Sequence, residues 1–122
     1  FVLCDSIGKK IKVVQDAAQA AGLTNVTAIH ARAEDLEGKY DFVVSRAVTR
    51  MARFVAWLDG KVKKQGTHPL PNGILYLKGG DLSEELSEIS EPWHTTPLNL
   101  WFNDSFFDEK KVVHVDLSSS RV

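Results

Sequence analysis

The strongest constraint on the fold is the alternation of short apolar runs with helix-forming stretches along the first two thirds of the chain. The apolar runs, rich in strand-forming residues, are Phe1–Cys4, Val26–Ala31, Tyr40–Val44 and Ile74–Leu77. Helices are predicted for Ser6–Ala21, Met51–Leu58 and the acidic segment Leu82–Ile89. Strands that alternate with helices over short connections indicate a parallel sheet covered on both faces, and therefore an α/β fold.

The first predicted helix, Ser6–Ala21, carries a start signal and a stop signal. Ser6 follows a buried run and can cap the helix by accepting a hydrogen bond from a free backbone N–H. Gly22 suits the position just after the last turn, where a left-handed backbone is common. These two signals set the expected bounds of the helix.

The last third of the chain changes character. Trp93–Trp101 and Lys111–Leu117 are extended in pattern and separated by the turn-rich Asn103–Glu109, so we expect an antiparallel hairpin. A Rossmann-like, mostly parallel sheet that closes with an antiparallel hairpin is the arrangement of S-adenosylmethionine-dependent methyltransferases. The pattern therefore favours that fold over a plain dehydrogenase fold.

Phe1 lies inside a predicted strand, with no initiator methionine and no polar arm before it. We therefore expect an N-terminally truncated chain that lacks the first strand of the sheet. On this expectation, residues 1–117 form the C-terminal portion of one methyltransferase domain, and residues 118–122 form a tail.

Composition and charge narrow the possible partners. The chain has 122 residues and a net charge of −1, without the general basic excess usual for nucleic-acid-binding domains. Positive charge is local, since residues 46–64 hold six basic side chains against one acidic, while residues 81–91 hold five acidic side chains and no basic one. The single cysteine, Cys4, fits a reducing cytoplasm, and no apolar run approaches the roughly 20 residues of a membrane span. We expect a cytoplasmic protein without a membrane partner.

Polar side chains follow the predicted strands at the points where ligands bind in open α/β sheets, beyond the carboxyl ends of the strands. They form four sets that we expect on one rim: Asp5 and Ser6, Arg32–Asp35, Ser45–Ala47, and Lys78–Gly80. Asp5 could accept hydrogen bonds from both ribose hydroxyls of a nucleoside, because a carboxylate has two acceptor oxygens. The alternative is that Asp5 only shares the helix cap with Ser6.

Ala33 and Glu34 lie where this type of fold brings a small and a polar residue against adenine. Without further evidence, the residues alone favour the alternative that Arg32, Glu34 and Asp35 form only a solvated turn. The guanidinium of Arg46 could hold a cofactor carboxylate, an RNA phosphate or a guanine edge. Alternatively, Arg46 could pair with Asp41 or cover the sheet edge. Arg46, Arg50 and Arg53 would share one helical face if the second helix began early enough.

Several kinds of site are not indicated. The four histidines are scattered without ligand spacing, so we predict no metal site. No nucleophile stands at a recognisable elbow with a matching histidine and acid, and no Gly-rich phosphate loop is present.

Four segments taken together resemble the bacterial ribosomal RNA guanine-N7 methyltransferases, also called glucose-inhibited division protein B. The segments are Val2–Lys10 (VLCDSIGKK), His30–Glu34 (HARAE), Asp41–Ala47 (DFVVSRA) and Leu75–Gly80 (LYLKGG). Their order and spacing are far more specific than any one of them, and the resemblance runs from Phe1 to about Leu117.

The resemblance implies transfer of the methyl group of S-adenosylmethionine to N7 of a guanine in 16S ribosomal RNA, on the small ribosomal subunit. It further implies which residues contact the cofactor and which contact RNA, and it places Arg46 near both the cofactor and the acceptor base. The implied residues are Asp5 and Ser6 at the ribose, Ala33 and Glu34 at adenine, Arg46 at the catalytic position, and Lys78 at RNA. The local positive charge of residues 46–64 adds Arg50 and Arg53 as predicted contacts with RNA phosphates. The glycine-rich first motif of the family would precede Phe1, so the chain by itself is predicted to be inactive.

The chemistry suits these residues, because guanine N7 has a free lone pair at neutral pH and its methylation needs no general base. Orientation and exclusion of water can supply most of the acceleration. Two alternatives remain open: a methyltransferase of the same fold with a non-RNA acceptor, and a non-catalytic α/β nucleotide-binding module.

Overall fold

The computed structural model describes residues 1–46 and 49–118, which form two compact units divided between Glu37 and Gly38. Both units combine strands with helices, which confirms the α/β class. Ala47 and the predicted tail beyond residue 118 lie outside the described residues. The two units are described separately below.

The first unit is a strand–helix–strand motif. It contains β1 (Val2–Asp5), α1 (Gly8–Ala20), β2 (Thr27–His30) and the short 3-10 helix η1 (Ala33–Asp35). β1 and β2 pair in parallel, from Val2 opposite Thr27 to Asp5 opposite His30, and α1 packs against both strands. Parallel pairing requires the crossover that α1 provides, and it brings the carboxyl ends of the two strands together.

The start of α1 differs from the prediction, whereas its predicted stop signal is found in the structure. The helix begins at Gly8 rather than Ser6, and Ser6 does not cap it: Ile7 is the N-cap residue, and the side chain of Asp5 accepts a hydrogen bond from the Ile7 N–H at 2.8 Å. The predicted stop at Gly22 is confirmed, because Gly22 has φ +70 and its N–H donates to the carbonyl of Gln19. The cap prediction was wrong because the helix begins two residues later than expected, and Asp5 orders the turn before it by accepting the Ile7 N–H in an Asx turn.

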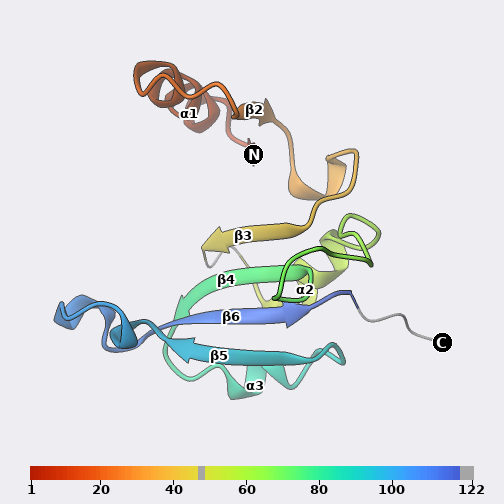
Figure 1. The fold of residues 1–122 in the computed structure, drawn as a ribbon, viewed down its shortest axis with the longest axis vertical. Coiled ribbons are helices and arrows are strands. Elements are labelled where there is room, and N and C mark those ends of the chain that lie inside the picture. The colour runs from red at the N-terminus through yellow and green to blue at the C-terminus, as the bar shows by residue number, and fades with distance from the viewer. Residues whose placement is uncertain (47–48, 119–122) are drawn as a thin grey trace. The chain divides into compact units, whose positions relative to one another are not determined.

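The second unit is a four-stranded sheet with two helices. Its strands and helices are β3 (Phe42–Arg46), α2 (Met51–Trp57), β4 (Gly73–Gly79), α3 (Ser83–Leu86), β5 (Trp93–Pro97) and β6 (Lys110–Asp116), with the 3-10 helices η2 (Leu98–Leu100) and η3 (Ser105–Phe107) between the last two strands. The strand order is β3-β4-β6-β5, with β3 parallel to β4 and β6 antiparallel to both of its neighbours (Figure 1).

The predicted C-terminal hairpin is therefore confirmed, with β5 ending at Pro97 rather than Trp101 because the chain turns into η2 at Leu98. The hydrogen bonds define a two-stranded and a four-stranded sheet. That both belong to one Rossmann-like sheet without its first strand, and that residues 1–117 are the C-terminal portion of one domain, stay predictions.

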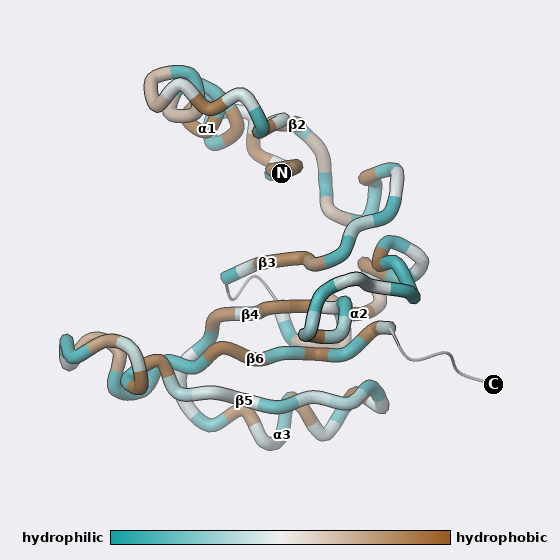
Figure 2. The backbone as a smooth tube through the Cα atoms, in the orientation of Figure 1, coloured by the Kyte–Doolittle hydropathy of each residue, from teal (hydrophilic) through white to brown (hydrophobic). Residues whose placement is uncertain are grey.

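The core of the second unit lies between one face of the sheet and the helices α2 and α3. Alternate residues of the two central strands enter it, because successive side chains of a strand point to opposite faces. These buried residues are Ile74 and Tyr76 of β4, Val113 and Val115 of β6, Met51, Phe54 and Leu58 of or next to α2, and Leu82 and Leu86 of or next to α3. Figure 2 shows hydrophobic residues along β3 and β4 and more polar ones along the end strand β5.

Candidate functional site

The carboxyl ends of β1 and β2 bring two of the predicted residue sets together in the first unit. Asp5, the last residue of β1, lies opposite His30, and its carbonyl accepts the N–H of Ala31 at 3.1 Å. The chain then turns through Arg32 into η1, which carries Ala33 and Glu34. The sequence-predicted ribose and adenine residues thus share one edge of the two-stranded sheet.

The carboxylate of Asp5 is half-buried, and only one of its two oxygens is hydrogen-bonded within the described residues. Its Oδ1 atom accepts the Ile7 N–H, whereas Oδ2 has no hydrogen bond within the described part of the chain. Asp5 therefore orders the turn before α1, and neither Asp5 nor Ser6 caps the helix itself. The second oxygen remains an acceptor that could serve a hydroxyl donor.

The edge formed by Asp5 and Glu34 carries negative charge. Burial raises the pKa of the neighbouring Cys4 thiol, and the carboxylates of Asp5 and Glu34 raise it further. Ala33 and Glu34 are half-buried, and Arg32, largely exposed, lies 3.9 Å from Glu34 between Nη1 and Oε1. The turn is thus ion-paired and partly solvated, and it also presents a carboxylate beside the ends of β1 and β2.

His30 contacts the turn between β1 and α1, and the sequence pattern did not indicate this contact. Its Nε2 atom lies 3.0 Å from the carbonyl oxygen of Ser6, and a Cβ atom at Gly8 would lie 3.3 Å from the imidazole ring. The imidazole therefore packs against the turn between β1 and α1, which fixes the backbone that follows Asp5.

Arg46 and Lys78 stand at the carboxyl ends of β3 and β4 in the second unit. Arg46 is the last residue of β3 and lies opposite Leu77, so Lys78 is one residue further along β4 and its side chain points to the other face of the sheet, toward α3. The side chain of Arg46 is exposed. Asp41 precedes the opposite end of β3, where Lys63 and His68 approach its carboxylate at 3.9 and 4.0 Å. A strand of this length separates Arg46 from Asp41 by about 15 Å, which rules out the alternative ion pair.

The three arginines do not share one helical face, because the second helix does not begin early enough. α2 begins only at Met51, Arg50 is its N-cap residue in an extended conformation, and Arg46 belongs to β3. The Nε atom of Arg50 donates to Glu88 at 2.9 Å, and this hydrogen bond and the charge of Glu88 raise the pKa of Arg50. Arg53, on α2, is exposed.

Tyr76 holds the chain segment that leads from β3 into α2. Its side chain is fully buried, and its hydroxyl donates to the carbonyl oxygen of Thr49 at 2.5 Å and accepts the Thr49 N–H at 3.1 Å. The two bonds tie the backbone three residues beyond Arg46 to the centre of the sheet. No local pattern indicates this contact, because its partners are 27 residues apart.

We expect Tyr76→Phe to lower the free energy of unfolding by about 1–2 kcal/mol, because it removes two hydrogen bonds from a part-buried backbone group. Urea denaturation measures the change. Thr49→Ala is the matched control, since both bonds involve only the backbone of residue 49 and survive that substitution. Equal stability of Tyr76→Phe and the unsubstituted protein would contradict the role of the hydroxyl.

Glu85 joins two elements at the same edge of the sheet. It is 8% exposed; one carboxylate oxygen accepts from Nζ of Lys78 and the other accepts the N–H of Met51 at 2.8 Å. Lys78, predicted as an RNA contact, is therefore ion-paired to the acidic helix α3, and its side chain is 27% exposed.

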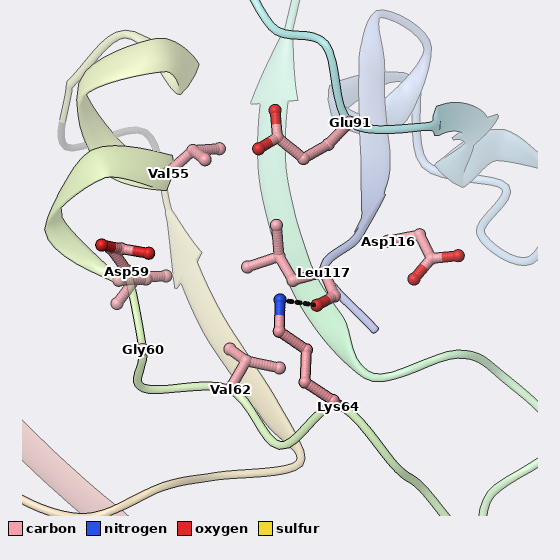
Figure 3. A pocket seen from close by; sticks show the side chains of 9 residues that line it. Val55, Asp59, Gly60, Val62, Lys64, Glu91, Asp116 and Leu117 are labelled. Carbon is pink, nitrogen blue, oxygen red and sulfur yellow. Dashed lines mark hydrogen bonds between the residues drawn. The ribbon is translucent and has the colours of Figure 1, made fainter. Parts of the chain in front are cut away.

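A cavity of about 160 Å³ lies at the opposite edge of this sheet. Figure 3 shows Asp59, Lys64, Glu91 and Asp116 among its lining residues. Asp116 lies opposite Gly73, the first residue of β4, so the cavity borders the amino end of that strand rather than the carboxyl end that carries Lys78. The hollow is thus separate from the predicted functional edge.

Two further observations concern only residues 1–46 and 49–118. No three His, Cys, Asp or Glu side chains gather there in a way that could hold a metal ion. No helix in that part of the chain has both the length and the apolar character needed to cross a membrane.

Comparison with known proteins identifies the family to which this chain belongs. Residues 1–112 match the family model described as GidB, rRNA small subunit methyltransferase G. The chain is similar to proteins named ribosomal RNA small subunit methyltransferase G from three bacteria. It is 56% identical over 118 residues to that of Flavobacterium johnsoniae, 54% over 117 residues to that of Flavobacterium psychrophilum, and 53% over 115 residues to that of Cytophaga hutchinsonii.

The matches cover nearly all of this chain and little more than half of each relative. They include 96%, 96% and 94% of the chain, respectively, and 56% of the length of each of the three relatives. The chain therefore corresponds to about half of a protein of that kind.

Proposed function

Because this chain belongs to the rRNA small subunit methyltransferase G family, we propose that its parent protein transfers the methyl group of S-adenosylmethionine to N7 of a guanine in 16S ribosomal RNA. It acts in the cytoplasm on the small ribosomal subunit. The observation that carries the proposal is the family match over residues 1–112, which includes every sequence-predicted site residue.

The first unit binds the nucleoside part of the cofactor. Asp5 offers Oδ2 to the ribose hydroxyls, with Ser6 beside it, and Ala33 and Glu34 line the adenine. The chemistry of the donor set supports this assignment: two carboxylates that raise the pKa of Cys4 form an electronegative edge, which suits hydroxyl and amino donors and a sulfonium cation.

The second unit acts on the acceptor side. Arg46 is the catalytic residue, because its exposed, planar guanidinium at the end of β3 can hold a carboxylate, a phosphate or a guanine edge. Lys78, Arg50 and Arg53 contact the RNA backbone. The exposure of Arg53 and the partial exposure of Lys78 support contacts with phosphate.

S-adenosylmethionine supplies, when bound, an electrophilic methyl group on a sulfonium. Guanine N7 would accept that methyl group through its free lone pair, without losing a proton. The protein residues therefore orient the base and exclude water, and no side chain serves as a general base.

The test is transfer of labelled methyl from S-adenosylmethionine to small ribosomal subunits isolated from cells that lack the enzyme. The proposal expects label in the RNA of the subunit with the parent protein. Label in a protein or a small molecule would instead favour a methyltransferase of the same fold with another acceptor. Cofactor binding without transfer to any acceptor would favour a non-catalytic binding module.

We expect Asp5→Ala in the parent protein to weaken S-adenosylmethionine binding by about 1–3 kcal/mol, the scale of a lost hydrogen bond to a charged group. Isothermal titration calorimetry measures the affinity. Asp5→Asn is the informative control, because its amide oxygen can still accept the Ile7 N–H while the negative charge is gone. An unchanged affinity of Asp5→Ala would remove Asp5 from the cofactor site.

A further inference from the structure

Glu85 is a buried carboxylate on a helix that otherwise presents its acids to solvent. In α3 and the turn after it, Glu84 and Glu88 are exposed, whereas Glu85 is 8% exposed. Burying a carboxylate costs free energy unless its oxygens are hydrogen-bonded and its charge is paired. Both conditions are met here, by Lys78 on one oxygen and by the backbone N–H of Met51 on the other.

The two partners of Glu85 belong to separate parts of the candidate acceptor site. Lys78 lies at the carboxyl end of β4, the strand paired with the one that ends at Arg46, and its side chain faces α3. Met51 begins α2, the element that follows the connection from Arg46, and Tyr76 ties the same connection at Thr49. One side chain therefore links Lys78 to the segment that leads away from Arg46.

We propose that Glu85 is a positioning residue for methyl transfer, which holds the ammonium of Lys78 and the start of α2 in one fixed arrangement. The inference rests on the proposed function, because it assigns Glu85 a role toward the same acceptor site. Lys78 donates one N–H to Glu85 and keeps two more donors, and its side chain is partly exposed, so the lysine can be held by Glu85 and still face an RNA group.

The effect of Glu85 on catalysis follows from rigidity. An isolated lysine samples many rotamers, and the first N–H groups of a helix have no partner within the helix. The carboxylate of Glu85 restricts the rotamers of Lys78 and also provides a partner for the N–H of Met51. Without its charge, Lys78 can turn away from the edge and the start of α2 loses its electrostatic anchor, although the sheet and the core contacts of α2 remain.

The experiment compares Glu85→Gln with Glu84→Gln in the parent protein, assayed for methyl transfer to small ribosomal subunits. Both variants remove one negative charge from the same helix, but Glu84 is exposed. We expect Glu85→Gln to lower kcat about 10-fold, with the KM for S-adenosylmethionine unchanged within about 2-fold, because a misplaced group costs rate rather than cofactor affinity. Glu84→Gln is expected to match the unsubstituted protein.

Two further measurements separate positioning from a general structural role. The backbone amide of Met51 is expected to exchange hydrogen faster in Glu85→Gln than in Glu84→Gln. The double variant Lys78→Gln with Glu85→Gln is expected to lose less activity than the product of the two single losses, because part of the effect of Glu85 passes through Lys78.

A kcat of Glu85→Gln equal to that of Glu84→Gln would overturn the inference, and so would losses that multiply in the double variant. Absence of methyl transfer by the unsubstituted parent protein is a different result, because it overturns the proposed function and this role of Glu85 together. The activity of the unsubstituted protein therefore distinguishes failure of the proposed function from failure of the Glu85 role alone.

Discussion

Replacing Arg46 by alanine is expected to lower methyl transfer by the parent protein by about 100- to 1,000-fold, the range seen when one preorganised electrostatic donor is removed from an active site. The free energy of unfolding is expected to change by only about 0.5 kcal/mol, because the side chain is exposed at the end of β3. Rates from methyl-label transfer and midpoints of urea denaturation measure the two quantities on the same preparation.

The conservative variant Arg46→Lys is the control for this prediction. A lysine keeps the positive charge but not the planar fork, so an intermediate rate would show that the geometry of the guanidinium matters. Parallel losses of activity and stability in Arg46→Ala would instead mean that Arg46 only covers the edge of the sheet, the alternative that the sequence left open.

The second large effect is expected from Gly73→Ala, at the first residue of β4. A Cβ atom there would lie 1.9 Å from the backbone carbonyl oxygen of Val115, in the paired strand β6. Because both partners are backbone in the centre of the sheet, neither can move without breaking the pairing. We expect a loss of about 3 kcal/mol or more in the free energy of unfolding, the upper end of overpacking effects.

Urea denaturation followed by tryptophan fluorescence measures this loss. Gly8→Ala is the matched control, because the added methyl group would meet only the ring of His30, at 3.3 Å, and a side chain can shift. The control is expected to change the free energy of unfolding by about 1 kcal/mol or less. A Gly73→Ala protein as stable as the control would contradict the observed register of β4 and β6.

Local patterns predicted most of the secondary structure. Met51–Leu58 was expected as a helix and α2 is Met51–Trp57, and the expected strand Ile74–Leu77 is the centre of β4. These predictions succeeded because periodic apolar residues and turn residues act within a few positions of each other. The cap at Ser6 was wrong because α1 begins two residues later, at Gly8, and the preceding turn is held by the bond from the Ile7 N–H to Asp5.

The candidate site could be predicted only as a set of positions. Strand ends placed Asp5 beside the turn that holds Glu34, and Arg46 and Lys78 at the ends of two paired strands, because parallel neighbours end at the same edge. The contacts that fix those positions could not be predicted. Glu85 reaches Met51 across 34 residues and Tyr76 reaches Thr49 across 27, and no periodicity encodes such pairs. The acidic segment 81–91, which from the sequence only offset the basic one, supplies Glu85 and Glu88 as specific partners.

The most direct test of the central claim is the identity of the methylated nucleoside. Small ribosomal subunits labelled by the parent protein are digested to nucleosides, which are then separated and identified by mass spectrometry. The account predicts that the label is found in N7-methylguanosine from 16S ribosomal RNA. Label in any other nucleoside, or in ribosomal protein, would contradict it.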